Sequence, residues 1–325
     1  MRVLILGGAG MIGRKLAERL ALDGRLSGAA IEKLTLYDIV PATPPAGSDF
    51  PVEIATGDLP AAGEMERLLA DKPDIIFHLA AIVSGQAEQE FDLGYRINTD
   101  GTRAVLEAAR AAGHRPRIIF ASSLAVFGAP LPEPIGDDQA AAPLTSYGAQ
   151  KAIGELLVSD YTRKGFVDGL ALRLPTICVR PGKPNAAASG FFSAIIREPL
   201  AGQEAVLPVS EDVKHWHASP RAAVGFLVHA AALDSAAVGP RRAFTLPGVA
   251  VTVGGQIDAL RKLAGDKVAA RIRREPDPFV QNIIAGWPRS FDTRRALELG
   301  FRAENSFEEI IRVHIEDELG GVIPA

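Results

Sequence analysis

Residues 2–13 read RVLILGGAGMIG, an apolar run that leads directly into a glycine-rich turn. The first five residues of this stretch have the aliphatic character of a buried strand, and the residues after the turn predict a helix. Glycine allows a tight turn and lets a phosphate approach the N–H groups at the start of a helix, where the dipole favours negative charge. The stretch therefore predicts the first strand, turn and helix of a dinucleotide-binding unit. The residues expected at the pyrophosphate are Gly7, Gly10, Met11, Ile12 and Gly13.

A carboxylate, Asp38, ends the second apolar run, residues 33–38. At this position in a dinucleotide-binding fold, a carboxylate accepts hydrogen bonds from the adenine ribose and repels a 2′-phosphate. The next residues, Ile39 and Val40, offer no cation that would compensate. We therefore expect NAD as the cofactor in preference to NADP, although Asp38 could also be a turn residue before Pro41.

The alternation of strands and helices extends this unit to about residue 174. Residues 65–70, 102–112 and 147–164 have apolar residues at helical spacing. Strand-like runs alternating with helices indicate an α/β fold with a doubly wound (Rossmann) parallel sheet, in which ligands bind at the carboxyl ends of the strands. The six predicted strands are residues 2–6, 33–38, 52–56, 74–79, 117–122 and 169–174.

After residue 174 the alternation stops, and several prolines and a glycine interrupt the chain. We predict helices at 191–197, 221–233 and 307–316, and short strands at 242–246 and 269–273. The expected organisation is an NAD-binding Rossmann domain at 1–174 that carries the catalytic residues. A smaller C-terminal α+β lobe at 175–325 would mainly bind substrate.

The composition excludes several classes of protein. A chain of 325 residues that is 47% hydrophobic can bury a large core, and a net charge of −4 provides no basic surface for a nucleic acid. The single cysteine, Cys178, cannot form an internal disulfide and is expected to be a buried strand residue. No secretory leader and no apolar run of about twenty residues is apparent. We expect a cytoplasmic protein with no nucleic-acid or membrane partner.

The candidate catalytic residues are Tyr147 and Lys151, which lie four residues apart at the start of a predicted helix and so share one face. A phenol has a pKa near 10, and a neighbouring ammonium stabilises the phenolate, which brings proton transfer within reach. Such a pair also occurs by chance on amphipathic helices. Its weight comes from Ser122 and Ser123, which end a predicted strand at the ligand-binding edge, although these serines could instead cap a loop.

These motifs together resemble the extended short-chain dehydrogenases/reductases, the NAD-dependent epimerase/dehydratase superfamily, over essentially the whole chain. The resemblance also includes Asp58-Leu59, the HLAA run at 78–81 and the NTDGT run at 98–102. It implies that Ser123 orients the reacting oxygen, that Tyr147 exchanges the proton and that Lys151 also holds the nicotinamide ribose. It further implies a homodimer built by the helices at 102–112 and 147–164. The additional cofactor contacts that it implies are Asp58, Leu59, Leu79, Ala80, Ala81, Val83, Asn98, Pro175 and Ile177, besides Tyr147 and Lys151.

A narrower resemblance concerns the substrate. Residues 82–85, 91–96, 174–185 and 197–202 are similar to sugar-acid dehydrogenases. This similarity implies NAD-dependent oxidation of the C2 hydroxyl of D-erythronate to 2-oxo-tetronate, with Tyr147 as general base. Sugar-nucleotide members of the superfamily usually have an Arg-Asp-aromatic segment followed by an acidic pair where this chain reads KHWHASPR at 214–221.

A sugar acid needs a cation or N–H groups for its carboxylate and hydroxyl partners for its other end. Loop capping is the alternative for Ser84 and Asn185, and a solvated surface is the alternative for Lys183. Arg180 and Arg221 are further candidates for the carboxylate. The candidate substrate residues are Ser84, Ser123, Tyr147, Thr176, Lys183 and Asn185.

A metal site and two other functions are the remaining alternatives. His215 and His217 flank Trp216, and two potential ligands without a third favour aromatic packing over a metal site, so no metal is expected. The chain could instead be a nucleotide-sugar epimerase or dehydratase that uses bound NAD, or a non-catalytic dinucleotide sensor.

Overall fold

The structure is a computed structural model that describes residues 1–128, 130–182 and 189–323. Its main feature is a seven-stranded parallel sheet with the strand order β12-β8-β7-β6-β1-β4-β5. This confirms the predicted doubly wound α/β fold. All six strands predicted from the sequence are present. The strands of the sheet are β1 (Arg2–Leu6), β4 (Lys33–Asp38), β5 (Val52–Thr56), β6 (Ile75–His78), β7 (Arg117–Ser123), β8 (Asp168–Leu174) and β12 (Ala243–Thr245).

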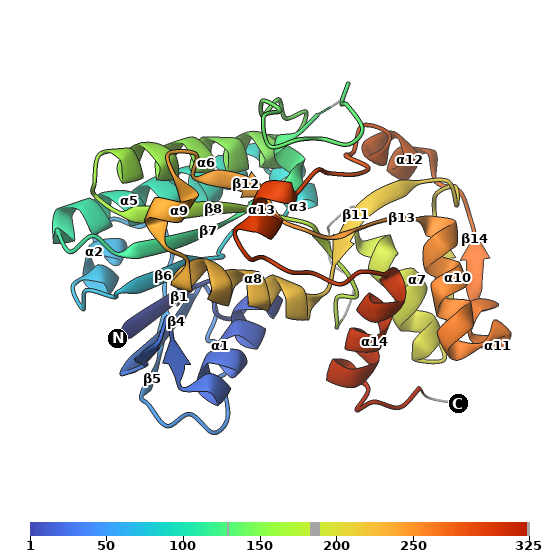
Figure 1. Cartoon of the computed structure of the whole chain (residues 1–325), viewed down its shortest axis with the longest axis horizontal. Coiled ribbons are helices and arrows are strands. Elements are labelled where there is room, and N and C mark those ends of the chain that lie inside the picture. The colour runs from blue at the N-terminus through green and yellow to red at the C-terminus, as the bar shows by residue number, and fades with distance from the viewer. Residues whose placement is uncertain (129, 183–188, 324–325) are drawn as a thin grey trace.

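Helices cover both faces of this sheet (Figure 1). α1 (Met11–Asp23) and α8 (Pro220–Ala232) lie on one face, and α2 (Glu64–Leu69), α5 (Gly101–Ala112) and α6 (Ser146–Arg163) lie on the other. The strands show why both faces are covered, because successive side chains of a strand point to opposite sides. In β1, Val3 and Ile5 belong to one buried apolar cluster and Leu4 and Leu6 belong to another.

The seventh strand corrects one part of the sequence analysis. We placed residues 242–246 in the smaller lobe, but β12 (Ala243–Thr245) pairs with β8, with Ala243 opposite Ala171 and Thr245 opposite Arg173. Helix α8 also returns to the large sheet and packs beside α1. The chain therefore leaves the sheet after β8 and comes back to it. The functional division at residue 174 stays a prediction.

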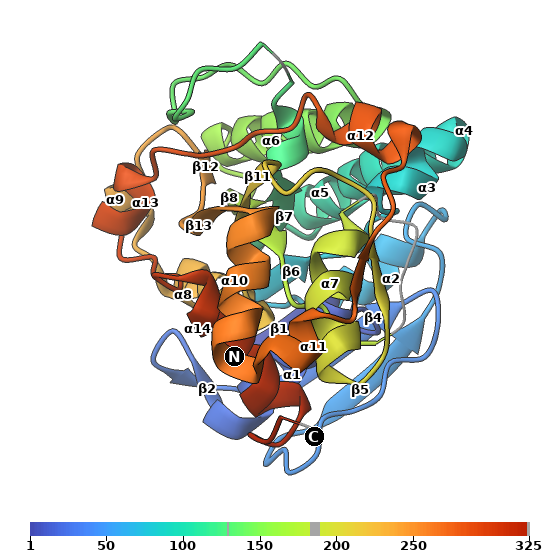
Figure 2. The same ribbon diagram turned by 90° about the vertical axis from the view of Figure 1, so that its right-hand side faces the viewer.

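The smaller lobe, which faces the viewer in Figure 2, contains two short sheets. One has the order β13-β11-β9, formed by β9 (Thr176–Ile177), β11 (Lys214–Ala218) and β13 (Val249–Thr252). The other pairs β10 (Ala205–Leu207) with β14 (Ile272–Arg274), so the strand predicted at 269–273 begins three residues later than expected, after the helix α11 (Asp266–Ala269). The predicted helices at 191–197 and 307–316 correspond to α7 (Gly190–Leu200) and α14 (Phe307–Glu318).

The remaining elements are short, apart from one helix of the smaller lobe. They are β2 (Arg25–Leu26), β3 (Ala29–Ala30), α3 (Ser84–Gln89), α4 (Phe91–Gly94), a π-helix at Tyr95–Asp100, a 3₁₀ turn at Leu124–Val126, α9 (Ser235–Val238), α10 (Val253–Ala264), α12 (Pro278–Ile284) and α13 (Arg294–Glu298). Across the described ranges, the helices are all too short or too polar to span a bilayer.

Candidate active site

The glycine-rich turn joins β1 to α1 at the carboxyl edge of the large sheet. Gly7 has a φ of +92°, a conformation that favours glycine, and its N–H donates to the carbonyl of Tyr37 at 2.8 Å. A Cβ on Gly13 would lie 2.1 Å from the carbonyl oxygen of Gly7, so only glycine lets α1 start this close to the turn. No side chain caps the N-terminus of α1, which follows Gly10. The N–H groups of its first turn are therefore available to a phosphate.

Asp38 lies beside this turn, at the end of β4. One carboxylate oxygen accepts from the N–H of Ala9 at 2.9 Å, and the other accepts from the N–H of Ile39 at 2.7 Å. Each oxygen of an ionised carboxylate has a further lone pair, so the group can still accept from two ribose hydroxyls. The turn, the uncapped helix and this carboxylate fit a dinucleotide.

Residues 79–83 form the next part of this edge. The N–H groups of Leu79 and Ala80 both donate to the carbonyl of Leu6, which holds the end of β6 against the glycine-rich turn. Ala81 and Val83 continue this loop at the surface. The loop therefore lies at the same edge of the sheet as the glycine-rich turn, and its contact with the cofactor stays a prediction.

Asn98 is buried behind this loop. Its Oδ1 accepts from the N–H of Ile82 at 2.8 Å, and its Nδ2 donates to the carbonyl of Ile82 at 3.1 Å and to Oε1 of Gln150 at 2.7 Å. The side-chain amide of Asn98 thus forms these hydrogen bonds within the protein. Asn98 therefore holds the loop in place, and the direct cofactor contact expected from the sequence stays a prediction.

Asp58 and Leu59 follow β5 at the adenine side of the predicted site. Asp58 forms an ion pair with Nη1 of Arg96 at 2.6 Å. The sequence analysis missed Arg96, and its place in the 91–96 run gave no sign of a partner 38 residues away. Leu59 is buried, and its side chain packs against Gly101 at the start of α5, so it supports the site from below its surface.

The two serines at the end of β7 point to opposite sides, as successive strand residues do. Ser122 is buried and donates to Oε1 of Glu155 at 2.5 Å. Ser123 is partly exposed, and its Oγ accepts from the N–H of Ala125 at 3.1 Å. Of the pair, Ser123 is therefore the one that the structure makes available to a ligand.

Tyr147 and Lys151 lie one turn apart at the start of α6. The hydroxyl of Thr145 caps this helix by accepting from the N–H of Gly148 at 3.1 Å. Nζ of Lys151 donates to the carbonyl of Ala121 at 2.8 Å and lies 5.6 Å from the centre of the Tyr147 ring. Burial lowers the pKa of Lys151 to about 7. The structure thus brings the end of β7 and the start of α6 together, as the sequence analysis expected.

The acidity of Tyr147 depends on three opposing effects. Burial raises its pKa to about 12, while a hydrogen bond with Ser123 and the charge of Arg180 act in the lowering direction. We expected this lowering from Lys151. Arg180, which the sequence analysis considered only for the substrate carboxylate, is thus a second cation that acts on the phenol, besides Lys151, whose Nζ lies 5.6 Å from the ring centre.

The remaining substrate candidates differ in their positions. Thr176, in β9, has its hydroxyl 2.7 Å from Nε2 of His215, and Ser84 is the partly buried first residue of α3. Arg221 forms ion pairs with Glu316 at 2.9 Å and Asp317 at 2.5 Å on the side of the smaller lobe. Lys183 and Asn185 lie outside the described residues. Pro175 and Ile177 flank Thr176 and are buried.

His215 and His217 belong to a buried aromatic cluster on one face of β11. Phe192 stacks on His215 with ring centres 5.3 Å apart and meets His217 edge-on at 4.7 Å. Trp216 points to the other face, where its Nε1 donates to the carbonyl of Leu246 at 3.1 Å. In the part of the chain that the structure describes, no three His, Cys, Asp or Glu side chains form a group that could hold a metal ion.

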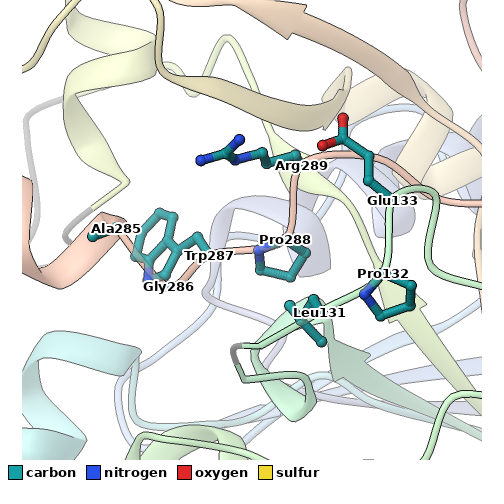
Figure 3. Close-up of a pocket in the computed structure, with 8 residues that line it drawn as sticks. All are labelled: Leu131, Pro132, Glu133, Ala285, Gly286, Trp287, Pro288 and Arg289. Atoms are coloured by element: carbon teal, nitrogen blue, oxygen red, sulfur yellow. The ribbon is translucent and has the colours of Figure 1, made fainter.

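A small cavity of about 160 Å³ adjoins this cluster (Figure 3). Its walls come from two loops, residues 131–133 and 285–289. The ring of Trp287 lies 5.2 Å from that of His215, so one wall of the cavity also packs against the aromatic cluster.

Comparison with known proteins gives consistent results. The model of the family described as "NAD dependent epimerase/dehydratase family" matches residues 3–218. A D-erythronate dehydrogenase from Cupriavidus necator is 51% identical over 321 residues, which cover 98% of both chains. A D-erythronate dehydrogenase from Haemophilus influenzae is 44% identical over 98% of this chain and 100% of its own. A crystal structure described as a nucleoside-diphosphate-sugar epimerase from Agrobacterium tumefaciens has 60% identity and a TM-score of 0.98, over 100% of this chain and 96% of that one.

Proposed function

The chain belongs to the NAD-dependent epimerase/dehydratase family, and from that premise we propose that it is a dehydrogenase that oxidises the C2 hydroxyl of D-erythronate to a ketone. Two full-length relatives with this activity in their names support the substrate. The observation that carries the reaction type is the convergence of Ser123, Tyr147 and Lys151 at the edge of the sheet that also holds the glycine-rich turn.

The chain's own residues divide the work as follows. Ser123 and Tyr147 hold the C2 hydroxyl by hydrogen bonds, and Tyr147 accepts its proton as the C2–H bond breaks. The pKa of about 12 that burial gives Tyr147 must fall for this transfer, and Ser123 and Arg180 both act in that direction. Lys151 stays close to the phenol and binds the nicotinamide ribose. Bound dinucleotide supplies the acceptor for the hydride from C2.

We further propose that the dinucleotide is NAD. The carboxylate of Asp38 has two N–H donors but no cation as a hydrogen-bond partner among the described residues, so it would repel a 2′-phosphate. The neighbouring Ile39 and Val40 are exposed and apolar and cannot supply a compensating charge.

A nucleotide-sugar epimerase is the second candidate, because the Agrobacterium structure carries that description. The segment 214–221 argues against it. Lys214 is paired with Glu133 at 2.8 Å, and Arg221 is paired with Glu316 and Asp317, so the cations of this segment already have acidic partners. A sugar diphosphate needs cations that are free to bind it. The intact Ser123, Tyr147 and Lys151 argue against a non-catalytic sensor.

The decisive experiment mixes purified protein with D-erythronate and NAD and follows the absorbance of reduced nicotinamide. We expect NADH to accumulate in proportion to the acid consumed, and we expect the Tyr147→Phe variant to bind NAD but to lose turnover by about a hundredfold or more. An epimerase would instead interconvert a nucleotide sugar with no net NADH. Turnover of nucleotide sugars with none of any four- or five-carbon acid would reverse the two candidates.

We also propose a homodimer built by the outer faces of α5 and α6. Support comes from Leu156, which lies on the outer face of α6 and is 72% exposed, as a contact surface would be in an isolated chain. Light scattering should give twice the mass of one chain, and Leu156→Glu should shift the protein toward the monomer. A wild-type mass of one chain would refute this proposal.

A further inference from the structure

The hydrogen bonds of His215 fix the direction of the Thr176 hydroxyl. Nδ1 of His215 lies 2.8 Å from the carbonyl oxygen of Pro288, which can only accept, so Nδ1 carries the hydrogen. Burial lowers the pKa of His215 to about 4, so the ring is neutral and Nε2 is an acceptor. Nε2 lies 2.7 Å from Oγ1 of Thr176. The hydroxyl hydrogen of Thr176 therefore points to His215, and only lone pairs of Oγ1 face any ligand.

Arg180 is a cation with no acidic partner among the described residues. Its Nε donates to the carbonyl of Ile177 at 2.9 Å and its Nη2 donates to Oγ of Ser189 at 2.7 Å, so neutral oxygens hold the side chain. Among the described residues no carboxylate forms an ion pair with it, and positions 129, 183–188 and 324–325 contain no Asp or Glu. Burial lowers the pKa of Arg180, so its charge is poorly hydrated. A poorly hydrated cation of this kind favours an anionic ligand.

Two residues locate Arg180 relative to the chemistry. Its charge lowers the pKa of Tyr147 and also that of His215. The backbone supports the same placement, because Nε of Arg180 is held on the carbonyl of Ile177, directly after Thr176. Thr176 itself comes two residues after Leu174, which pairs with Ser123 at the end of β7. A ligand bound at Tyr147 therefore lies near Arg180, a cation with no acidic partner among the described residues. It also lies near Oγ1 of Thr176, which can only accept a hydrogen bond.

We propose that Arg180 and Thr176 determine which way round the sugar acid binds, with the carboxylate on Arg180 and a distal hydroxyl donating to Thr176. This inference rests on the proposed function and explains how the same site selects C2. The carboxylate carbon is bonded directly to C2, so a carboxylate held by the cation beside the phenol brings the C2 hydroxyl to Tyr147. The C3 and C4 hydroxyls are farther from the carboxylate. The reversed orientation would set the carboxylate against the lone pairs of Thr176 and leave Arg180 unpaired.

The test compares D-erythronate with D-erythronamide, which has the same C2 hydroxyl but no charge. With saturating NAD, we expect Arg180→Gln to raise KM for D-erythronate by about 10- to 100-fold, the usual range for losing a hydrogen-bonded charge partner. The same variant should change KM for the amide by less than about fivefold. Arg180→Lys, which keeps the charge, should restore most of the preference for the acid. A purely structural role for Arg180 would weaken both substrates equally.

Variants of Thr176 provide a second test, which does not depend on how well the Arg180 variants fold. Thr176→Val should raise KM for D-erythronate by about 5- to 10-fold, and Thr176→Ser should not, because serine keeps the accepting oxygen. Neither variant should change KM for 2-hydroxybutanoate, which has the carboxylate and the C2 hydroxyl but no distal hydroxyl.

The outcomes separate this inference from the proposed function. If the wild-type chain oxidises D-erythronate and Arg180→Gln keeps the wild-type ratio of acid to amide, the orientation is wrong and the proposed function stands. If both Thr176 variants behave like the wild type, the distal contact is wrong. If the wild-type chain does not oxidise D-erythronate, the proposed function fails and this inference fails with it.

Discussion

Gly13→Ala tests how closely α1 must approach the glycine-rich turn. The added Cβ would lie 2.1 Å from the carbonyl oxygen of Gly7, 2.9 Å from Cα of Gly8 and 3.0 Å from the carbonyl carbon of Gly7. All three contacts are with backbone, so no side chain can rotate away. A normal contact needs roughly 1 Å more room, and the start of α1 must therefore move away from β1.

The size of the effect follows from that displacement. Overpacking of a close-packed site usually costs about 1–3 kcal/mol. The turn and the first N–H groups of α1 would bind the same pyrophosphate, so separating them should also raise the Kd for NAD by about 10- to 100-fold. Unfolding in urea without cofactor measures the first effect, and calorimetric titration with NAD measures the second.

Gly225→Ala is the matched control, because Gly225 also lies in a helix, α8, but a Cβ there would meet nothing within 4 Å. Alanine should leave NAD binding unchanged and stabilise the helix by about 0.5–1 kcal/mol. If Gly13→Ala unfolds at the same urea concentration as the wild type and binds NAD with the same Kd, the close approach described above does not hold the cofactor site.

Three further outcomes are expected. Asp38→Ser should narrow the preference for NAD over NADP by about tenfold or more in kcat/KM, and an unchanged ratio would remove Asp38 from the ribose site. Arg180→Gln should move the rise of kcat/KM with pH to higher pH, because loss of the cation raises the pKa of Tyr147, which otherwise faces Ser123 and Lys151. Lys151→Met should stabilise the cofactor-free chain most at or below pH 7. Burial lowers the pKa of Lys151 to about 7 in the folded chain, whereas in the unfolded chain it is about 10. Between about pH 7 and pH 10 the unfolded wild-type chain therefore binds one proton more than the folded chain. Wild-type stability should therefore gain about 2 kcal/mol between about pH 7 and pH 9, and the advantage of the variant in urea unfolding should shrink accordingly.

The sequence predicts the large sheet well because its central strands, such as β1 and β6, are buried on both faces and form apolar runs. It does not predict the place of β12. This strand has only three residues, Ala243–Thr245, and it joins the large sheet only by pairing with β8. Pairing across some 70 residues leaves no periodic pattern in the chain.

The same distinction applies to the site. The spacing of Tyr147 and Lys151 and the serine before them are local, and the sequence points to them. The Arg96–Asp58 ion pair and the contacts of His215 with Thr176 and Pro288 join residues 38 to 73 positions apart. The sequence shows His215 only as an aromatic neighbour of Trp216. Its effect on the Thr176 hydroxyl depends on which of its two ring nitrogens carries the hydrogen, and the folded contacts decide that.

The return of the chain to β12 has a practical consequence for anyone who wishes to isolate the cofactor-binding half. A fragment that stops at residue 174 would lack both β12 and α8, so β8 would become a bare outer strand and the apolar side of α1 would lose its cover. Exposed outer strands of this kind pair with the same strand of another copy, and the protein aggregates. A fragment for expression should therefore keep residues 220–246 and replace the excursion between β8 and α8 with a short linker.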